Sequence, residues 1–201
     1  MADDYMSTVG YTDHGMNHVG RVAEQAFTIL CDLGLPRREA ELAAIAGYLH
    51  DTGNVVHRIN HAQSSALMAF TILLRMGMPM REIAAVQGAI ANHDEDTGEP
   101  VSNAGAALII ADKSDVLRSR VRNPKMINFD IHDRVNYAAE ESELFVNHDR
   151  HLITLKLKID TTISQVIEYF EIFMSRMTMS RRAASFLNCD FSLIINEIQL
   201  M

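Results

Sequence analysis

Residues 49–53 read Leu-His-Asp-Thr-Gly and place two potential metal ligands, His50 and Asp51, side by side at the end of an apolar run. A buried imidazole and a buried carboxylate both lose their hydration, so each of them needs a partner. A divalent cation satisfies both groups, and histidine together with carboxylate suits zinc, iron, manganese and similar ions. The dipeptide alone is a weak signal, so its meaning depends on the side chains that can reach it.

Further residues of metal-binding type fall at the ends or on the inward faces of neighbouring helical segments. They are His18, His61, His93 and Asp112. Metal sites in helical bundles are built from inward side chains on facing helices. Two metal ions about 4 Å apart are a recurrent arrangement for hydrolysing phosphate esters. Asp51 is the candidate bridge between them, because it follows His50 but points about 100° further round the helix.

Each candidate ligand also has an ordinary structural interpretation. His50 and Asp51 would then form a hydrogen-bonded helix end, His61 would cap a helix or lie on the surface, and the helix dipole would favour His93 at a C-terminus. His57 competes with His61 for the same role, but His57 lies in a connector whereas His61 opens a helix. The remaining histidines are expected to be surface residues: His14, His132, His148 and His151.

Five helical segments must position these side chains, because apolar residues recur in them at spacings of three and four. The first runs from about residue 17 to 33, the second ends at 50–51, the third runs from 61 to a stop at 77, the fourth ends at 92–94, and the fifth runs from about 102 through 120. Residues 1–14 show no clear periodicity and are expected to be a loose lead-in. Residues 94–100 are polar and turn-rich, which predicts a loop.

The pattern changes after Pro124. A short helix is expected at 132–143, and a hairpin with strands at 143–146 and 152–159. Thr161 or Thr162 is expected to cap a long helix that reaches Met177, and residues 191–200 to form a last strand. The fold class is therefore mainly α: a helical bundle over residues 14–123, followed by a small α+β extension over residues 124–201 (hairpin, long helix and last strand).

Composition and charge exclude several classes of protein. The 201 residues are 48% hydrophobic, which is enough for a globular core. A formal net charge of -8 argues against non-specific binding to nucleic acid or to an anionic membrane, since both reward excess lysine and arginine. Cys31 and Cys189 form no close pair and are expected to be free thiols. Because there is no apolar run of membrane-spanning length and no signal-peptide pattern, a cytoplasmic location is expected.

The order His…His-Asp…His…His…Asp resembles the HD-domain superfamily of metal-dependent phosphohydrolases. The matching strings are His-Val-Gly-Arg-Val from residue 18, Leu-His-Asp-Thr-Gly-Asn from residue 49, and Ile-Ala-Asp-Lys from residue 110. They cover roughly residues 14–122, as a five-helix core. The resemblance implies two metal sites that share Asp51. The first site would use His18, His50, Asp51 and Asp112, and the second would use Asp51, His61 and His93.

The function implied by this resemblance is hydrolysis of a phosphomonoester or phosphodiester, in a nucleotide, by metal-activated hydroxide. The cofactor would be one or two divalent transition metal ions, with Fe, Mn, Zn, Co and Ni not distinguished. Dinucleoside polyphosphate hydrolases of the superfamily are similar in size and also carry both extra histidines. Two alternatives stay open: a non-catalytic, regulatory metal-binding module, and a di-iron oxygenase.

Residues just beyond Asp112 could complete such a site. Lys113 and Arg118 are the candidate ligands of substrate phosphate, although the helix dipole would also favour cations there. Asp115 lies three residues after Asp112 on the same helical face and could relay a proton to the leaving group. Asp51, Lys113 and Asp115 are thus the candidate catalytic residues. The exposed edges of a three-stranded sheet in the extension further suggest a homodimer.

Overall fold

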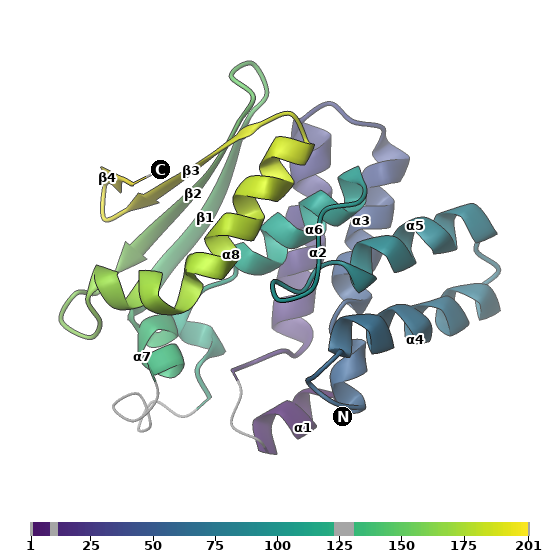
Figure 1. Cartoon of the computed structure of the whole chain (residues 1–201), viewed down its shortest axis with the longest axis horizontal. Coiled ribbons are helices and arrows are strands. Elements are labelled where there is room, and N and C mark those ends of the chain that lie inside the picture. The colour runs from purple at the N-terminus through teal and green to yellow at the C-terminus, as the bar shows by residue number, and fades with distance from the viewer. Residues whose placement is uncertain (1, 9–11, 123–130, 201) are drawn as a thin grey trace.

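The computed structural model describes residues 2–8, 12–122 and 131–200, and it is mainly helical with a small sheet towards the C-terminus (Figure 1). The helices are α1 (Ala2–Thr8), α2 (Met16–Asp32), α3 (Arg37–Leu49), α4 (His61–Arg75), α5 (Met80–Ala91), α6 (Asn103–Ser114), α7 (Ile131–Ala138) and α8 (Val166–Phe186), with 3-10 turns η1 (Thr52–Val55) and η2 (Arg118–Arg120). The strands are β1 (Ala139–Asn147), β2 (Leu152–Ile159), β3 (Asp190–Ile195) and β4 (Ile198–Gln199). The predicted fold class is confirmed.

Helix α6 is the centre of the molecule. It contacts α2, α3 and α5 of the bundle and also α8 of the extension. A helix that is apolar on every side is buried on every side, and α6 is buried from Ala104 to Ala111. Its residues are mostly small, so several neighbours can approach its axis closely. Asp112, at its C-terminal end, is thereby held in the middle of the fold.

Two glycines allow the close contacts that bring the candidate ligands together. A Cβ atom on Gly47 would lie 2.8 Å from the Cα of Ala23, so α2 and α3 can cross this closely only with glycine there. A Cβ atom on Gly53 would lie 2.3 Å from the carbonyl oxygen of His61. Gly53 therefore lets η1 pack directly against the start of α4, which carries His61 towards Asp51.

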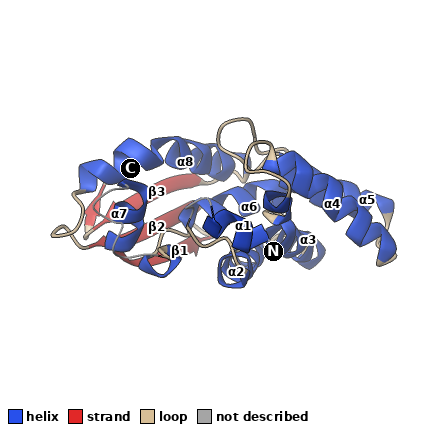
Figure 2. Ribbon diagram, turned by 90° about the horizontal axis from the view of Figure 1, so that it is seen from below, coloured by secondary structure: helices blue, strands red, loops and turns tan. Residues whose placement is uncertain are grey.

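The sheet has the order β1-β2-β3-β4 in the described residues. Strands β1 and β2 form an antiparallel hairpin, β2 and β3 are parallel, and β3 and β4 are antiparallel. Helix α8 makes the crossover between β2 and β3 and covers one face of the sheet (Figure 2). The alternating apolar residues of β2 are buried in one core with α8: Ile153, Leu155, Leu157 and Ile159.

The sheet with α8 lies at one end of the molecule and the α4–α5 hairpin at the other, with α2, α3 and α6 between them (Figures 1 and 2). Side chains of the bundle and of the extension belong to the same hydrophobic cluster. The division at residue 123 into a core and an extension stays a prediction. Among the described helices, none is both long and apolar enough to cross a bilayer.

Several predicted boundaries are wrong, and the largest error concerns α6. The apolar pattern predicted a helix through Arg120, but α6 ends at Ser114. The Ser114 hydroxyl donates to the carbonyl of Ala111, and the backbone of Asp115 leaves the helical region with φ -79° and ψ 71°. Serine and aspartate side chains compete with the helix for backbone groups in this way. Asp115 and Arg118 consequently lie on a turn rather than on one face with Asp112.

The extension differs from the prediction at three boundaries. Strand β1 begins at Ala139 rather than at Glu143, since pairing with β2 extends back to Ile159. Helix α8 begins at Val166 because Gln165 and Glu168 form a capping box, while Thr162 instead binds the carboxylate of Asp160. The last strand is two strands, because residues 196 and 197 both have positive φ and turn the chain into β4.

The N-terminal segment differs from its prediction. Residues 2–8 form helix α1, where a loose lead-in was expected.

The outer strands of the described sheet are β1 and β4. The homodimer stays a prediction, and light scattering at micromolar concentration tests it: a dimer is expected, and a monomer would contradict it.

Candidate metal centre

The first predicted ligand set converges where α2, α3 and α6 meet. His18 Nε2 lies 3.3 Å from His50 Nε2 and 3.4 Å from Asp112 Oδ1. Asp51 Oδ2 lies 3.4 Å from His50 Nε2 and 3.6 Å from His18 Nε2. Ligand atoms about 2.1 Å from a tetrahedral ion are themselves about 3.4 Å apart. The atoms of His18, His50 and Asp112 are therefore spaced as ligands of one divalent ion, and Asp51 Oδ2 lies at ligand spacing from both histidines.

The second predicted set lies on the other side of Asp51. Asp51 Oδ1 is 3.5 Å from His61 Nε2, which is 3.2 Å from His93 Nε2. The two oxygens of Asp51 thus face different sets, as a bridging carboxylate requires. Among the described residues, two overlapping groups have ligand atoms within 4.8 Å of one another: His18, His50 and Asp112, and His50, Asp51 and His93.

Hydrogen bonds to the far side of each imidazole fix which nitrogen is free. Nδ1 of His50, His61 and His93 donates to the carbonyl oxygens of Gly47, Arg58 and Ile90, at 2.7, 3.0 and 2.6 Å. A carbonyl oxygen can only accept, so whenever one of these rings is neutral its Nε2 atom keeps the lone pair and faces inward. Lone pairs that face each other across about 3 Å repel unless a cation lies between them. The residues therefore fit a metal ion.

The protonation states also suit a divalent ion. Burial lowers the pKa of His93 to about 3, and burial together with Arg58 lowers the pKa of His61. Burial alone would raise the pKa of Asp51, but nearby imidazoles, chiefly His50, hold it well below its usual value. His61 and His93 are therefore neutral and Asp51 is ionised near neutral pH, which is the state that metal binding requires. Burial would lower the pKa of His50, but Asp51 and Asp112 outweigh it and raise that pKa, so a metal ion that binds there displaces a proton.

Comparison with known proteins agrees with this geometry. The profile of the HD domain matches residues 15–118, slightly more than half of the chain. The chain belongs to the HD domain family. The predicted resemblance is confirmed, and HD domains bind divalent metal ions. A search of curated protein sequences found no match.

A crystal structure described as a predicted HD superfamily hydrolase, from an uncultured Thermotogales bacterium, is similar to this HD domain protein. The two sequences are 30% identical, and the match covers 58% of this chain and 63% of that chain with a TM-score of 0.46. The chain thus spans less than two thirds of the length of that relative.

Lys113 of the HD domain protein lies beside the metal centre, as predicted. Its Nζ is 2.6 Å from Asp112 Oδ2 and 2.6 Å from Glu95 Oε2. Arg176 of α8 donates from Nε to the other oxygen of Glu95 at 3.0 Å. Burial would lower the pKa of Lys113, but Asp112 and Glu95 outweigh it and raise that pKa. The buried ammonium therefore stays charged next to a metal ligand.

The structure does not bring Asp115 into the cluster. His18 Nδ1 donates to Asp115 Oδ2 at 2.7 Å, so the His18 ring lies between this carboxylate and the ligand atoms. A carboxylate in this position orients a metal-binding imidazole. That position suits orientation of His18 rather than the predicted relay of a proton to the leaving group.

Asp115→Asn is expected to weaken metal binding at the first set by about 10- to 100-fold, because the amide orients His18 poorly and makes it less basic. Titration of metal-free protein with Mn²⁺ measures the effect, and the melting temperature in excess chelator separates it from a loss of fold. Unchanged affinity with unchanged melting would show that Asp115 does not support the metal.

Arg118 also lies away from the predicted phosphate-binding position. Its Nε donates to the carbonyl of Tyr137 at 2.7 Å, and its guanidinium lies 4.8 Å from the centre of the Tyr137 ring. Glu140 and Asp160 are 3.8 and 3.9 Å from its Nη2 atom. Because α6 ends early, Arg118 is directed towards the extension.

Arg118→Ala is therefore expected to lower the free energy of unfolding by about 1–2 kcal/mol, through the lost bond to a carbonyl and the lost contact with the ring. Denaturant unfolding measures this change. Catalytic efficiency on any hydrolysed ester should stay within about twofold of the parent chain. A loss of about tenfold or more without a change in metal content would restore Arg118 to the substrate site.

Sequence reasoning missed other side chains that border the small cavity at the metal centre. They are His14, Arg58, Glu95 and Arg176. His14 was expected on the surface, but its ring centre lies 5.7 Å from that of His18, and burial lowers its pKa to about 3. Its spacing of four from His18 was the available signal. The other three predicted surface histidines are exposed, as is His57.

Proposed function

We propose that this HD domain protein is a metal-dependent phosphohydrolase that cleaves a phosphomonoester or phosphodiester bond of a nucleotide. The observation that carries the proposal is the shared carboxylate of Asp51. One of its oxygens faces His18 and His50, and the other faces His61. A pair of ion sites joined in this way is suited to a phosphate ester, whose attacking and leaving oxygens both need stabilisation.

Two divalent ions bound here would lower the pKa of a water molecule and draw charge from the phosphoryl oxygens. The protein's own residues set the positions of the groups that would take part in that chemistry. Asp51 sets the spacing of the two sets, and the carbonyl partners of the imidazoles keep their Nε2 atoms directed inward. Lys113 presents a fixed positive charge where negative charge grows on the phosphoryl group. Burial of these groups excludes bulk water, so each electrostatic contact is stronger.

Arginines at the border of the cavity support a nucleotide as the substrate. Arg58, Arg120 and Arg176 surround the ligand residues there. One guanidinium group can bind two oxygens of a phosphate at once, through two parallel hydrogen bonds. Several of them around one phosphoryl site suit a substrate whose negative charge extends beyond the group that is cleaved.

The proposal is tested with protein loaded in turn with Mn²⁺, Fe²⁺, Co²⁺, Ni²⁺ and Zn²⁺ and supplied with a panel of phosphomonoesters, nucleotides and dinucleotides. Release of phosphate or of a nucleotide is expected with at least one ion, and chelation should abolish it. Oxygen consumption without hydrolysis would instead indicate the oxygenase alternative. Full metal loading with no turnover of any ester would overturn the proposed activity and favour a regulatory module.

A further inference from the structure

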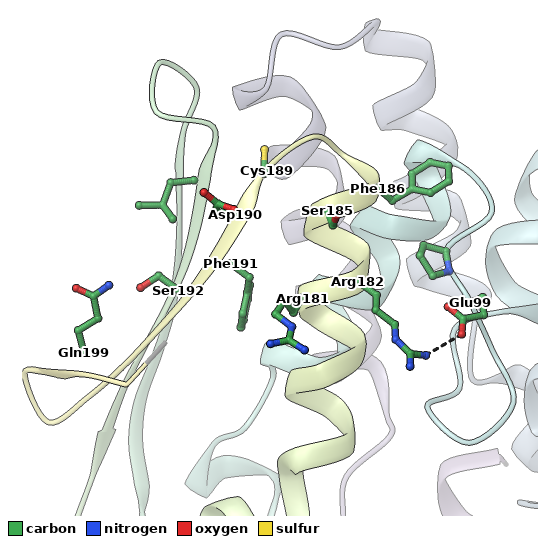
Figure 3. Close-up of a pocket in the computed structure, with 12 residues that line it drawn as sticks. Glu99, Arg181, Arg182, Ser185, Phe186, Cys189, Asp190, Phe191, Ser192 and Gln199 are labelled. Atoms are coloured by element: carbon green, nitrogen blue, oxygen red, sulfur yellow. Dashed lines mark hydrogen bonds and ion pairs between the residues drawn. The ribbon is translucent and has the colours of Figure 1, made fainter.

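The loop between α5 and α6 is joined to α8 by ion pairs at two points. Glu95 Oε1 accepts from Arg176 Nε at 3.0 Å, beside the metal centre. Glu99 Oε1 accepts from Arg182 Nη1 at 2.7 Å, at the edge of a shallow groove of about 890 Å³ (Figure 3). The loop at residues 94–100 thus lies against the extension and closes the metal cavity on that side.

Glu95 holds two cations with one carboxylate. Its Oε2 is 2.6 Å from Lys113 Nζ, and its Oε1 is 3.0 Å from Arg176 Nε. Lys113 in turn contacts Asp112 Oδ2, so the Glu95 carboxylate is one side chain away from a candidate metal ligand. Arg176 also contacts Phe173, because its guanidinium lies 4.6 Å from the centre of the Phe173 ring.

A phosphoryl group would use the same contacts. It too offers two oxygens on one central atom to an ammonium and a guanidinium, and such charge-assisted bonds are strong. The cavity bordered by Glu95 has a volume of only about 20 Å³. That volume holds about one water molecule, so a phosphoryl group can enter only if a bordering group moves away.

We propose that Lys113 and Arg176 form a phosphate subsite, and that Glu95 occupies it as an internal competitor until a phosphoryl group displaces it. The inference rests on the proposed function and adds a substrate-binding residue from the extension. Glu95 is the group that can leave, because it lies on a loop, whereas the ligand residues are held by helices. Lys113 keeps its contact with Asp112 after the exchange.

A purely structural role for Glu95 makes the opposite prediction. In that case Glu95 would only neutralise Lys113 and attach the loop to α8, and its loss would loosen both cations. Binding of a phosphate group would then weaken or stay the same. Removal of a competitor, by contrast, strengthens binding, so the sign of the change distinguishes the two roles.

The probe is inorganic phosphate, titrated calorimetrically into Mn²⁺-loaded protein. Glu95→Gln is expected to bind phosphate about tenfold more tightly than the parent chain, since one charge-assisted contact is no longer contested. Glu99→Gln is the matched control, because it removes the neighbouring contact between the loop and α8 outside the cavity, and its affinity should stay within about twofold. The double variant Glu95→Gln/Arg176→Gln should bind phosphate about tenfold more weakly than Glu95→Gln alone. Unchanged or weaker binding by Glu95→Gln overturns the inference.

A second measurement uses the unaltered chain and does not depend on how the variants fold. Added phosphate should accelerate amide hydrogen exchange in residues 94–100, because the loop loses its contact with Lys113 and Arg176. Slower or unchanged exchange counts against displacement. Failure of the proposed function looks different: phosphate binds and Glu95→Gln binds it more tightly, yet no ester is hydrolysed. If neither protein binds phosphate, the inference fails.

Discussion

Asp51→Ala is expected to abolish binding of both metal ions and to lower turnover by more than about a thousandfold. The reason is that its Oδ2 atom faces His18 and His50 while its Oδ1 atom faces His61. In the two predicted sets every other candidate ligand belongs to one set, whereas this carboxylate belongs to both. Without Asp51, Asp112 is the remaining candidate carboxylate ligand beside His18 and His50.

Elemental analysis of purified protein, after equilibration with Mn²⁺ and removal of free ions, measures the effect of Asp51→Ala. Asp149→Ala is the matched control, because the Asp149 side chain is 98% exposed on the β1–β2 turn. The control should retain the metal content and activity of the parent chain. A parental metal content in Asp51→Ala would mean that the bridging role is misassigned.

His61→Ala should have a smaller but more selective effect: loss of one of two bound ions and a fall in turnover of about a hundredfold or more. His61 Nε2 lies 3.2 Å from His93 Nε2 and 3.5 Å from Asp51 Oδ1, so its loss leaves the set around His18 and His50 with its own ligands. The expected stoichiometry therefore changes from two ions to one.

His57→Ala provides a close control for this experiment. His57 precedes the same helix but is exposed, and its Nδ1 accepts from the backbone of Ile59. Both ions and full turnover are expected in this variant. Equal losses in the two variants would indicate a general disturbance of the α4 region, and an unaltered stoichiometry in His61→Ala would remove His61 from the ligand set.

The helical bundle and the clustering of the candidate ligands could be predicted because local signals agree with the fold. Apolar residues at helical spacing identified α2 to α5, and the candidate ligands lie at or near the ends of those helices. The order of histidines and aspartates then resembled a known family. By contrast, the end of α6 depends on Ser114 and Asp115, and besides the nearby carbonyl of Ala111 their partners include Gln25 and His18 elsewhere in the fold. A periodicity that continues through such residues cannot reveal the break.

The extension shows the same division between local and distant causes. Both boundaries of strand β2 were predicted correctly, because alternation of apolar and polar residues is a local property. The parallel pairing of β2 with β3 depends on where α8 lies, which no short pattern encodes. Arg176 is the clearest case at the site. It is 64 positions beyond Asp112 and enters only because α8 packs on α6.

The small, fully buried residues of helix α6 also limit how this chain can diverge during evolution. Every side of α6 from Ala104 to Ala111 is already occupied by a neighbour, so a larger side chain there has no space. A duplicated gene that acquired a new substrate would have to inherit this helix nearly unchanged. Larger side chains have space instead on the exposed side of α8, where Met174 for example is open to solvent. Descendants of this chain would therefore share the position of Asp112 and differ in what reaches it.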